Sequence, residues 1–108
     1  MSLELPRTIE SYFTADAGNS EAVAQCFTEN ATVIDEGQTY QGLVAIKTWK
    51  IESTKKYTYT SVPHSVEDRD GKTIVTSHVS GNFPGSPIDL RYFFGLEGDK
   101  IASLEIAL

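Results

Sequence analysis

Four β-type segments, separated only by short turns, fill the second half of the sequence. Each is rich in β-branched and aromatic residues and is bounded by turn residues such as the Asp70-Gly71 pair. The predicted strands span residues 57–68, 73–83, 88–96 and 100–106. Strands joined by turns this short pair antiparallel, because a parallel connection needs a crossover of a dozen residues or more. This half of the chain therefore predicts an antiparallel meander.

The first half of the chain predicts helices instead. Apolar residues recur at helical spacing from Leu5 onward, and Gly18 suits the end of this helix. A short second helix is predicted to begin at the cap residue Asn19. Its apolar face would comprise Ala22, Val23, Cys26 and Phe27. A third helix is predicted from Gly42, and its buried face would comprise Leu43, Ile46 and Trp49.

A short β-branched strand, residues 31–35, is predicted between the second and third helices, with Val33 and Asp35 on the same face. The element order is therefore α-α-β-α-β-β-β-β. Helices early and strands late are typical of an α+β domain whose sheet curls around helices on its concave side. We expect the sheet to bulge or bend sharply at Pro63 and Gly81.

Alternation in the strand 88–96 predicts that both faces of the sheet are covered. One face of this strand, from Ile88 to Leu96, is wholly apolar, and the other face is mixed. A sheet one layer thick would leave its convex face wet, so we expect a second chain to pack sheet against sheet. The sequence therefore predicts a homodimer formed through the convex sheet face.

Length, charge and cysteine content narrow the classes of function. The 108 residues are expected to form one domain, 1–108. The formal net charge of -6 is expected to repel phosphate backbones and anionic lipids, so no nucleic acid and no membrane partner is predicted. The single cysteine, Cys26, cannot form an internal disulfide, and residues 1–7 have no apolar signal core. A cytoplasmic location is therefore expected.

Several stretches of the chain carry a family resemblance. They are Tyr12, Gly18-Asn19-Ser20-Glu21-Ala22, Phe27, Asn30-Ala31-Thr32-Val33-Ile34-Asp35, Tyr40-Gln41-Gly42, Ala45-Ile46, Trp49 and residues 98–104. Together they resemble the SnoaL-like domains of the nuclear transport factor 2-like superfamily over nearly the whole chain. The resemblance implies a cone-shaped α+β barrel, with three N-terminal helices packed in a strongly curved antiparallel sheet. It implies less about function, because members include isomerases, cyclases, dehydratases, epoxide hydrolases and plain binding proteins.

Within this superfamily the segment 31–35 is most similar to the ketosteroid isomerases. Asp35 falls on the position of their proton-shuttling carboxylate, and Tyr12 falls near their pocket tyrosine on the first helix. Where those isomerases have an oxyanion-stabilising aspartate, this chain has Arg91. A cation there could stabilise an enolate, or it could pair with Asp35 and lower the pKa of that carboxyl. The sequence leaves both roles open.

Two other activities of the superfamily fit the residues less well. The Arg-x-Asp pattern of limonene epoxide hydrolase falls on residues 78–80, and its second aspartate falls on Ile106, so we reject that activity. The scytalone dehydratase chemistry needs two pocket histidines and an acid. A two-residue hairpin loop at Asp70-Gly71 would place His64 and His78 on opposite faces, and a three-residue loop would place them on one face. A bulge would change this count again.

The candidate catalytic residues are Asp35, His78, Arg91 and Tyr12. Asp35 is the predicted general base, and Tyr12, His78 or Arg91 would stabilise a developing oxyanion. The candidate ligand-binding residues are Tyr40, Trp49, His64 and Phe93. Neither a metal site nor a cofactor is predicted, because two isolated histidines and one cysteine leave a coordination shell short.

The sequence thus predicts a SnoaL-like small-molecule pocket protein. Its chemistry would be proton transfer, of the isomerase, cyclase or dehydratase kind, on a small apolar or aromatic compound. The alternative is a non-catalytic binding or dimerisation module whose pocket is filled by Tyr12, Trp49 and Phe93. An open, polar-lined cavity would favour the first prediction. A closed cavity, or an Asp35 held by Arg91, would favour the second.

Overall fold

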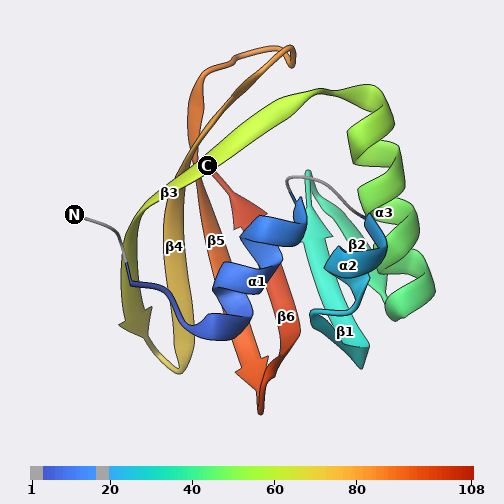
Figure 1. Cartoon of the computed structure of the whole chain (residues 1–108), viewed down its shortest axis with the longest axis vertical. Coiled ribbons are helices and arrows are strands. Elements are labelled where there is room, and N and C mark those ends of the chain that lie inside the picture. The colour runs from blue at the N-terminus through green and yellow to red at the C-terminus, as the bar shows by residue number, and fades with distance from the viewer. Residues whose placement is uncertain (1–3, 17–19) are drawn as a thin grey trace.

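The computed structural model describes residues 4–16 and 20–108, and within them it has three helices and six strands (Figure 1). In chain order these are α1 (Arg7–Asp16), α2 (Ser20–Ala24), β1 (Phe27–Asp35), β2 (Gln38–Gln41), α3 (Leu43–Lys56), β3 (Tyr59–Arg69), β4 (Lys72–Gly81), β5 (Ile88–Glu97) and β6 (Lys100–Ala107). The predicted α+β class is confirmed. The four long strands lie where the alternation predicts them, with ends that shift by two residues or fewer.

The second helix is shorter than predicted. It ends at Ala24, and Phe27, predicted on its apolar face, begins β1 instead. Phe27 pairs with Ile101 of β6, whose backbone N–H donates to the Cys26 carbonyl at 2.8 Å. A short apolar run fits a helix end or a buried strand start equally well, and only this tertiary pairing decides. The predicted caps Gly18 and Asn19 lie outside the described residues.

A short strand, β2, is present that the sequence did not predict. Glu36 and Gly37, with φ of 52° and 75°, form a two-residue turn that folds β2 back onto β1. Such positive φ values are typical of the hairpin turns that match the twist of two paired strands. Four residues of mostly polar character carry too little periodicity to be recognised as a strand. Tyr40 therefore lies on a strand.

The sheet is mixed, so the prediction of a wholly antiparallel sheet is wrong. Its strand order is β2-β1-β6-β5-β4-β3, and β1 pairs in parallel with β6 while the other neighbours are antiparallel. The reason is the connection through α3, which carries the chain to the far edge of the sheet. The meander β3 to β6 then returns strand by strand to β1, and the six-stranded sheet stays open.

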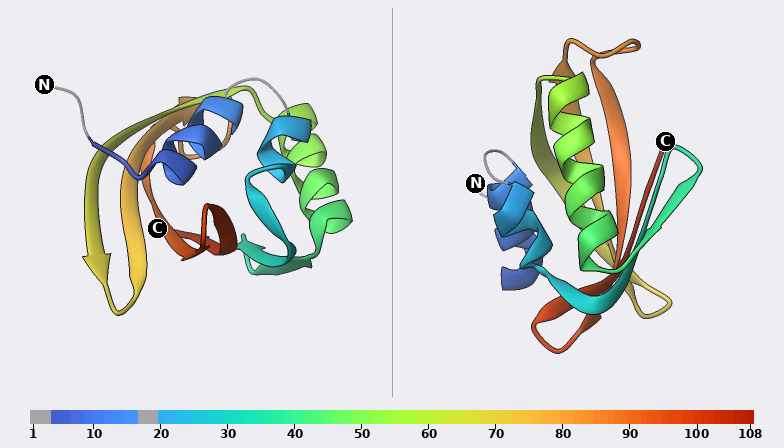
Figure 2. Two further views of the ribbon diagram at one scale, coloured as in Figure 1. Left: turned by 60° about the horizontal axis from the view of Figure 1, so that its bottom comes forward. Right: turned by 90° about the vertical axis from the view of Figure 1, so that its right-hand side faces the viewer.

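The sheet curls around the three helices, which all lie on its concave side (Figure 2). Between them lies a core of buried apolar and aromatic side chains, among them Ile9, Tyr12, Val33, Ile46, Trp49, Val75, Tyr92, Phe94 and Leu104. Paired residues on adjacent strands share a face of the sheet. Asp35 pairs with Ile106, and Ile106 pairs with the buried Tyr92. The carboxylate at the end of β1 is thereby turned toward the concave face.

The β3–β4 hairpin resolves the register that the sequence left open. Near its two-residue loop Val66 pairs with Val75, but the register shifts between Pro63 and Ser65, and beyond the shift Val62 pairs with His78. The bulge predicted at Pro63 is therefore confirmed. Its extra residue is His64, which lies on the same face of the sheet as His78, because both imidazoles contact Asp89.

Candidate functional site

A cavity of about 670 Å³ opens between α3, the concave face of the sheet and the loop that joins β4 to β5. Its lining includes several aromatic side chains: Tyr12, Tyr40, Trp49, Tyr57, Tyr59, Phe83 and Tyr92. The polar side chains that line it include Asp16, Asp35 and Lys50. The cavity is open and polar-lined, which is the outcome that favours a ligand pocket over a filled core.

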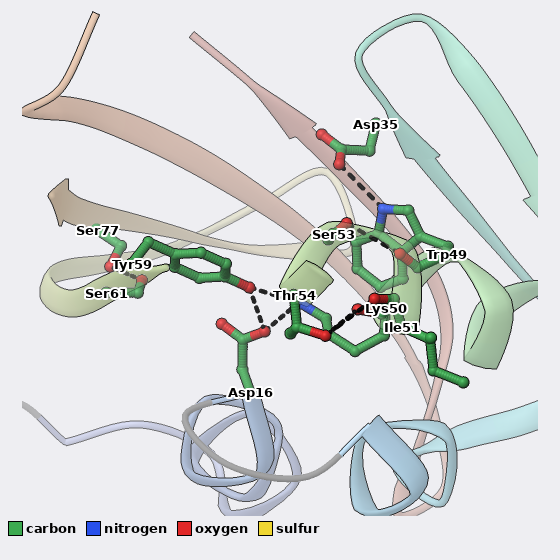
Figure 3. A network of polar contacts seen from close by, with 10 residues as sticks. All are labelled: Asp16, Asp35, Trp49, Lys50, Ile51, Ser53, Thr54, Tyr59, Ser61 and Ser77. Carbon is green, nitrogen blue, oxygen red and sulfur yellow. Dashed lines mark hydrogen bonds and ion pairs between the residues drawn. The ribbon is translucent and has the colours of Figure 1, made fainter. Parts of the chain in front are cut away.

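Asp35 lies in this cavity at the end of β1. The indole N–H of Trp49 donates to its Oδ2 at 3.0 Å (Figure 3). Trp49 is almost fully buried on α3, so the indole fixes the carboxylate through one oxygen. The other oxygen has no partner among the described residues and is available to a ligand. A carboxylate in this position can act as a base toward a bound molecule.

Tyr12 lines the same cavity from α1. It is 1% exposed, and no hydrogen bond joins its hydroxyl to another described residue. Burial and the nearby carboxylate of Asp16 raise its pKa well above the ordinary value of a tyrosine. The hydroxyl therefore stays protonated and can donate a hydrogen bond to a ligand oxygen. The prediction that Tyr12 and Asp35 share one pocket agrees with this geometry.

A buried charge network forms the floor of the cavity, and the sequence did not predict it. The Lys50 ammonium donates to Asp16 Oδ1 and to the Tyr59 hydroxyl, the latter at 2.7 Å, and that hydroxyl donates to Asp16 at 2.9 Å (Figure 3). The side chains of Lys50 and Asp16 are each 4% exposed. One signal was present, since Asp16 follows Tyr12 by four residues and so shares its helical face.

Tyr40 and Trp49, two predicted ligand-binding residues, also face the cavity. Their ring centroids are 6.2 Å apart, so the β2 tyrosine packs beside the indole that holds Asp35. Tyr92 completes the aromatic lining from β5, and burial raises its pKa above the ordinary range. The cavity thus offers flat apolar walls with neutral hydroxyl groups at their edges, which suits a small planar molecule.

The two histidines lie on the opposite side of the sheet. His78 Nδ1 is 3.0 Å from Asp89 Oδ1, and His64 Nε2 is 3.6 Å from Asp89 Oδ2, with all three side chains about half exposed. The hydrogen bond with His78 lowers the pKa of Asp89. The predictions that His78 is catalytic and that His64 binds the ligand are both wrong. Because β4 alternates, Ser77 and Val79 take the concave side, and His64 lies on the same face as His78. The dehydratase arrangement is absent from this pocket.

Arg91 and Phe93 also lie on the convex face. Arg91 is exposed, and its guanidinium donates to the Leu108 carbonyl at 2.7 Å. Its neighbours Leu90 and Tyr92 point into the cavity instead, so parity along β5 excludes Arg91 from it. Both predictions for Arg91, the enolate-stabilising cation and the partner of Asp35, are therefore wrong. Phe93 packs 5.5 Å from the Arg91 guanidinium and neither lines nor fills the pocket.

No group of three His, Cys, Asp or Glu side chains in residues 4–16 and 20–108 could hold a metal ion. No helix in these residues is both long and apolar enough to span a membrane. The cytoplasmic location expected from the sequence stays a prediction.

Comparison with known proteins identifies the class. No protein-family model and no curated protein sequence matches the chain. Among solved structures, a proposed polyketide cyclase from Sinorhizobium meliloti is 39% identical, with a TM-score of 0.90 and 94% of each chain covered. A protein of ketosteroid isomerase-like fold from Catenulispora acidiphila, solved with trimethylamine, is 18% identical, with a TM-score of 0.85 and coverage of 97% of this chain and 87% of that one.

A third solved structure is an epoxide hydrolase/cyclase-like enzyme, SalBIII, which functions in pyran ring formation in the polyether salinomycin. It is 24% identical, with a TM-score of 0.76, and the match covers 93% of this chain and 86% of that one. The fold and the pocket therefore define an α+β domain of the ketosteroid isomerase-like kind. The chain has the nuclear transport factor 2-like, SnoaL-like fold.

Proposed function

We propose that the cavity binds a small, largely apolar or aromatic carbonyl compound and that Asp35 transfers a proton on it. One observation carries this proposal: a carboxylate oxygen and a protonated hydroxyl, neither bonded to another described residue, lie in the same cavity. Trp49 donates a hydrogen bond to one oxygen of Asp35, and the protonated Tyr12 hydroxyl can donate a hydrogen bond to a ligand. A base and an oxyanion donor are the two groups that enolisation requires.

The step that these groups support can be written in full. The free oxygen of Asp35 takes a proton from the carbon next to the carbonyl, and the C–H electron pair becomes the enolate double bond. Negative charge develops on the carbonyl oxygen, where the Tyr12 hydroxyl donates a hydrogen bond. Asp35, now a carboxylic acid, returns the proton to another carbon in an isomerisation. In a cyclisation the enolate carbon attacks a second carbonyl, and Asp35 protonates the resulting alkoxide.

Similarity to the Sinorhizobium meliloti protein supports chemistry of this class. At 39% identity over 94% of both chains, the two proteins are close enough to share a pocket type, and that relative is a proposed polyketide cyclase. Cyclisation of a polyketide begins with an enolate, which is the species that Asp35 and Tyr12 would form. The aromatic lining is suited to the flat, conjugated carbonyl compounds from which such enolates form.

Deuterium uptake from heavy water tests the proposal. A panel of enolisable ketones, including 2-tetralone and a cyclic 1,3-diketone, is followed by proton NMR as the α-proton signal disappears. We expect Asp35→Asn to lower the catalysed rate by about 100-fold or more, because the general base is lost. Tyr12→Phe is expected to lower it by a similar factor. Because the pKa of Tyr12 is raised, its hydroxyl keeps its proton up to about pH 10, and deprotonation of Tyr12 should not lower the rate up to that pH.

Asp89→Asn is the matched control. It removes a carboxylate of the same kind from the convex face and should leave the rate unchanged. Retention of the full rate by Asp35→Asn would overturn the proposal. If the wild-type protein binds members of the panel, seen as a shift of the Trp49 indole signal, but never accelerates exchange, the non-catalytic binding module is the better account.

We also propose that two copies of the chain pair through the convex face of the sheet. None of the helices in the described part of the chain covers this face (Figure 2), and it carries Val62, which is 54% exposed, together with the partly exposed Phe93. Arg91 and Glu105 give it charges of both signs, which a two-fold related copy can pair. Exposed apolar side chains on a sheet face, together with charges that a second copy can pair, favour association.

A further inference from the structure

We propose that Lys50 is a positioning residue that sets the basicity of Asp35 through the indole ring of Trp49. The contact chain stands by itself, but its catalytic consequence rests on the function proposed above for Asp35. Three side chains carry the inference: an ammonium on the face of an indole, and a carboxylate at the edge of that same indole (Figure 3).

The geometry links the cation to the carboxylate directly. Lys50 Nζ lies 4.6 Å from the centroid of the Trp49 ring, and Trp49 Nε1 donates to Asp35 Oδ2 at 3.0 Å. A cation on the face of an aromatic ring draws on its π electrons. This leaves the indole N–H more positive, and polarised hydrogen-bond chains strengthen one another in a low-dielectric site. A stronger hydrogen bond to the charged carboxylate favours its ionised form.

Lys50 is held so that its charge cannot move away to solvent. Its ammonium is anchored to Asp16 of α1 and to the Tyr59 hydroxyl of β3, and the residue is 3% exposed. Lysines near a protein surface usually extend their charge into water. Here the three elements that wall the cavity fix it against the indole instead. The charge of Lys50 therefore stays at one fixed position relative to Trp49 and Asp35.

Few of the charges around Asp35 are buried. The titratable or charged groups that line its cavity come from every wall: Glu36 beside it, Tyr40 of β2, Tyr12 and Asp16 of α1, Lys50, Glu52, Lys55 and Lys56 of α3, Tyr57 directly after α3, Tyr59 of β3 and Tyr92 of β5. Burial raises the pKa values of Tyr12, Tyr59 and Tyr92, so these three hydroxyls carry no charge there. Glu36, Glu52, Lys55 and Lys56 are exposed to solvent, which screens their charges. The buried charges are therefore those of the Lys50–Asp16 pair.

Trp49 is the one tryptophan of the chain, so its indole N–H gives a single, resolved NMR signal. That signal should titrate with Asp35, which accepts its hydrogen bond, and Asp35→Asn should abolish the titration. The wild-type chain, Asp16→Asn and Lys50→Gln are each titrated from neutral pH down through the aspartate range without any substrate. Lys47→Gln, which removes an exposed lysine from the same helix, is the matched control.

Opposite shifts are expected in the two variants. Lys50→Gln removes the cation from the indole, so the midpoint of the Trp49 indole titration should move to higher pH. Asp16→Asn removes the anion that offsets Lys50, so this midpoint should move to lower pH. Mere loosening of the cavity would move both values in the same direction, toward that of an exposed aspartate. Shifts in one common direction, or none beyond the Lys47→Gln control, would therefore overturn the inference.

The experiment remains informative if one variant fails to fold, and it does not depend on catalysis. Should Lys50→Gln not fold, Asp16→Asn decides by itself, since an indole titration midpoint at lower pH supports the inference and an unchanged midpoint refutes it. The titration needs no turnover, so it separates this inference from the proposed function. Opposite shifts without any deuterium exchange would uphold the role of Lys50 and reject proton-transfer chemistry. Deuterium exchange without opposite shifts would support proton-transfer chemistry and reject the role of Lys50.

Discussion

Lys47 and Lys50 lie within one turn of α3 and make the same type of ion pair in different surroundings. Lys47 pairs with Glu21 at 3.1 Å, where the two side chains are 42% and 66% exposed. Lys50 pairs with Asp16 where both are 4% exposed. Water screens the first pair and competes for it, whereas the second has lost its hydration and depends on its partners. Breaking the buried pair should therefore lower the free energy of unfolding much more than breaking the exposed pair.

Methionine at each lysine measures that difference. We expect Lys50→Met to lower the free energy of unfolding by about 3–5 kcal/mol, because it leaves the Asp16 carboxylate buried without its cation. Lys47→Met is expected to cost about 1 kcal/mol or less. Urea denaturation followed by tryptophan fluorescence reports both. Similar costs at the two positions would show that the buried network contributes no more than a surface pair.

The start of β3 and the end of β4 meet at a contact that only glycine allows. Asn82 donates its backbone N–H to the Thr58 carbonyl at 3.1 Å and accepts the Thr58 N–H on its side chain at 2.9 Å. A β-carbon at Gly81 would overlap that carbonyl and lie 2.7 Å from the Tyr59 Cα. This contact fixes the β4–β5 loop beside Tyr57, and Phe83 of that loop lines the mouth of the cavity.

Alanine at Gly81 should be costly because the atoms in its way are backbone. We expect Gly81→Ala to lower the free energy of unfolding by about 1–3 kcal/mol in urea denaturation. Gly95 offers a comparison, since its obstruction is the Ser103 hydroxyl. Ser103→Ala should restore most of the stability lost in Gly95→Ala. Unchanged stability of Gly81→Ala would mean that the two strand ends can separate freely.

The sheet as a whole divides the molecule into a concave side that carries the pocket and a convex side with no helix. We expect the wild-type chain to sediment with the mass of two chains, because Phe93 and Val62 leave apolar surface on the convex face. Phe93→Glu should shift it to the mass of one. Val44→Glu, at an 84% exposed position on α3, should not. A wild-type monomer at all concentrations in analytical ultracentrifugation contradicts the proposed dimer.

Local pattern is sufficient for the long elements and for two of the candidate site residues. The alternation of residues 88–96 predicts β5, and helical spacing predicts the face of α1 that carries Tyr12. Parity along 31–35 puts Asp35 on the face of Val33. These inferences hold because they depend on neighbours in the chain, where spacing fixes direction.

Tertiary structure decided the rest. Which face of the sheet is concave cannot be read from alternation, so His78 and Arg91 were assigned to the pocket although they lie on the convex side. The parallel pairing of β1 with β6 joins segments some seventy residues apart, and no local pattern encodes it. Lys50, Asp16 and Tyr59 come from three elements, and they look like surface residues until the fold removes them from water. Burial, the property that gives them their effect on the site, belongs to the assembled molecule.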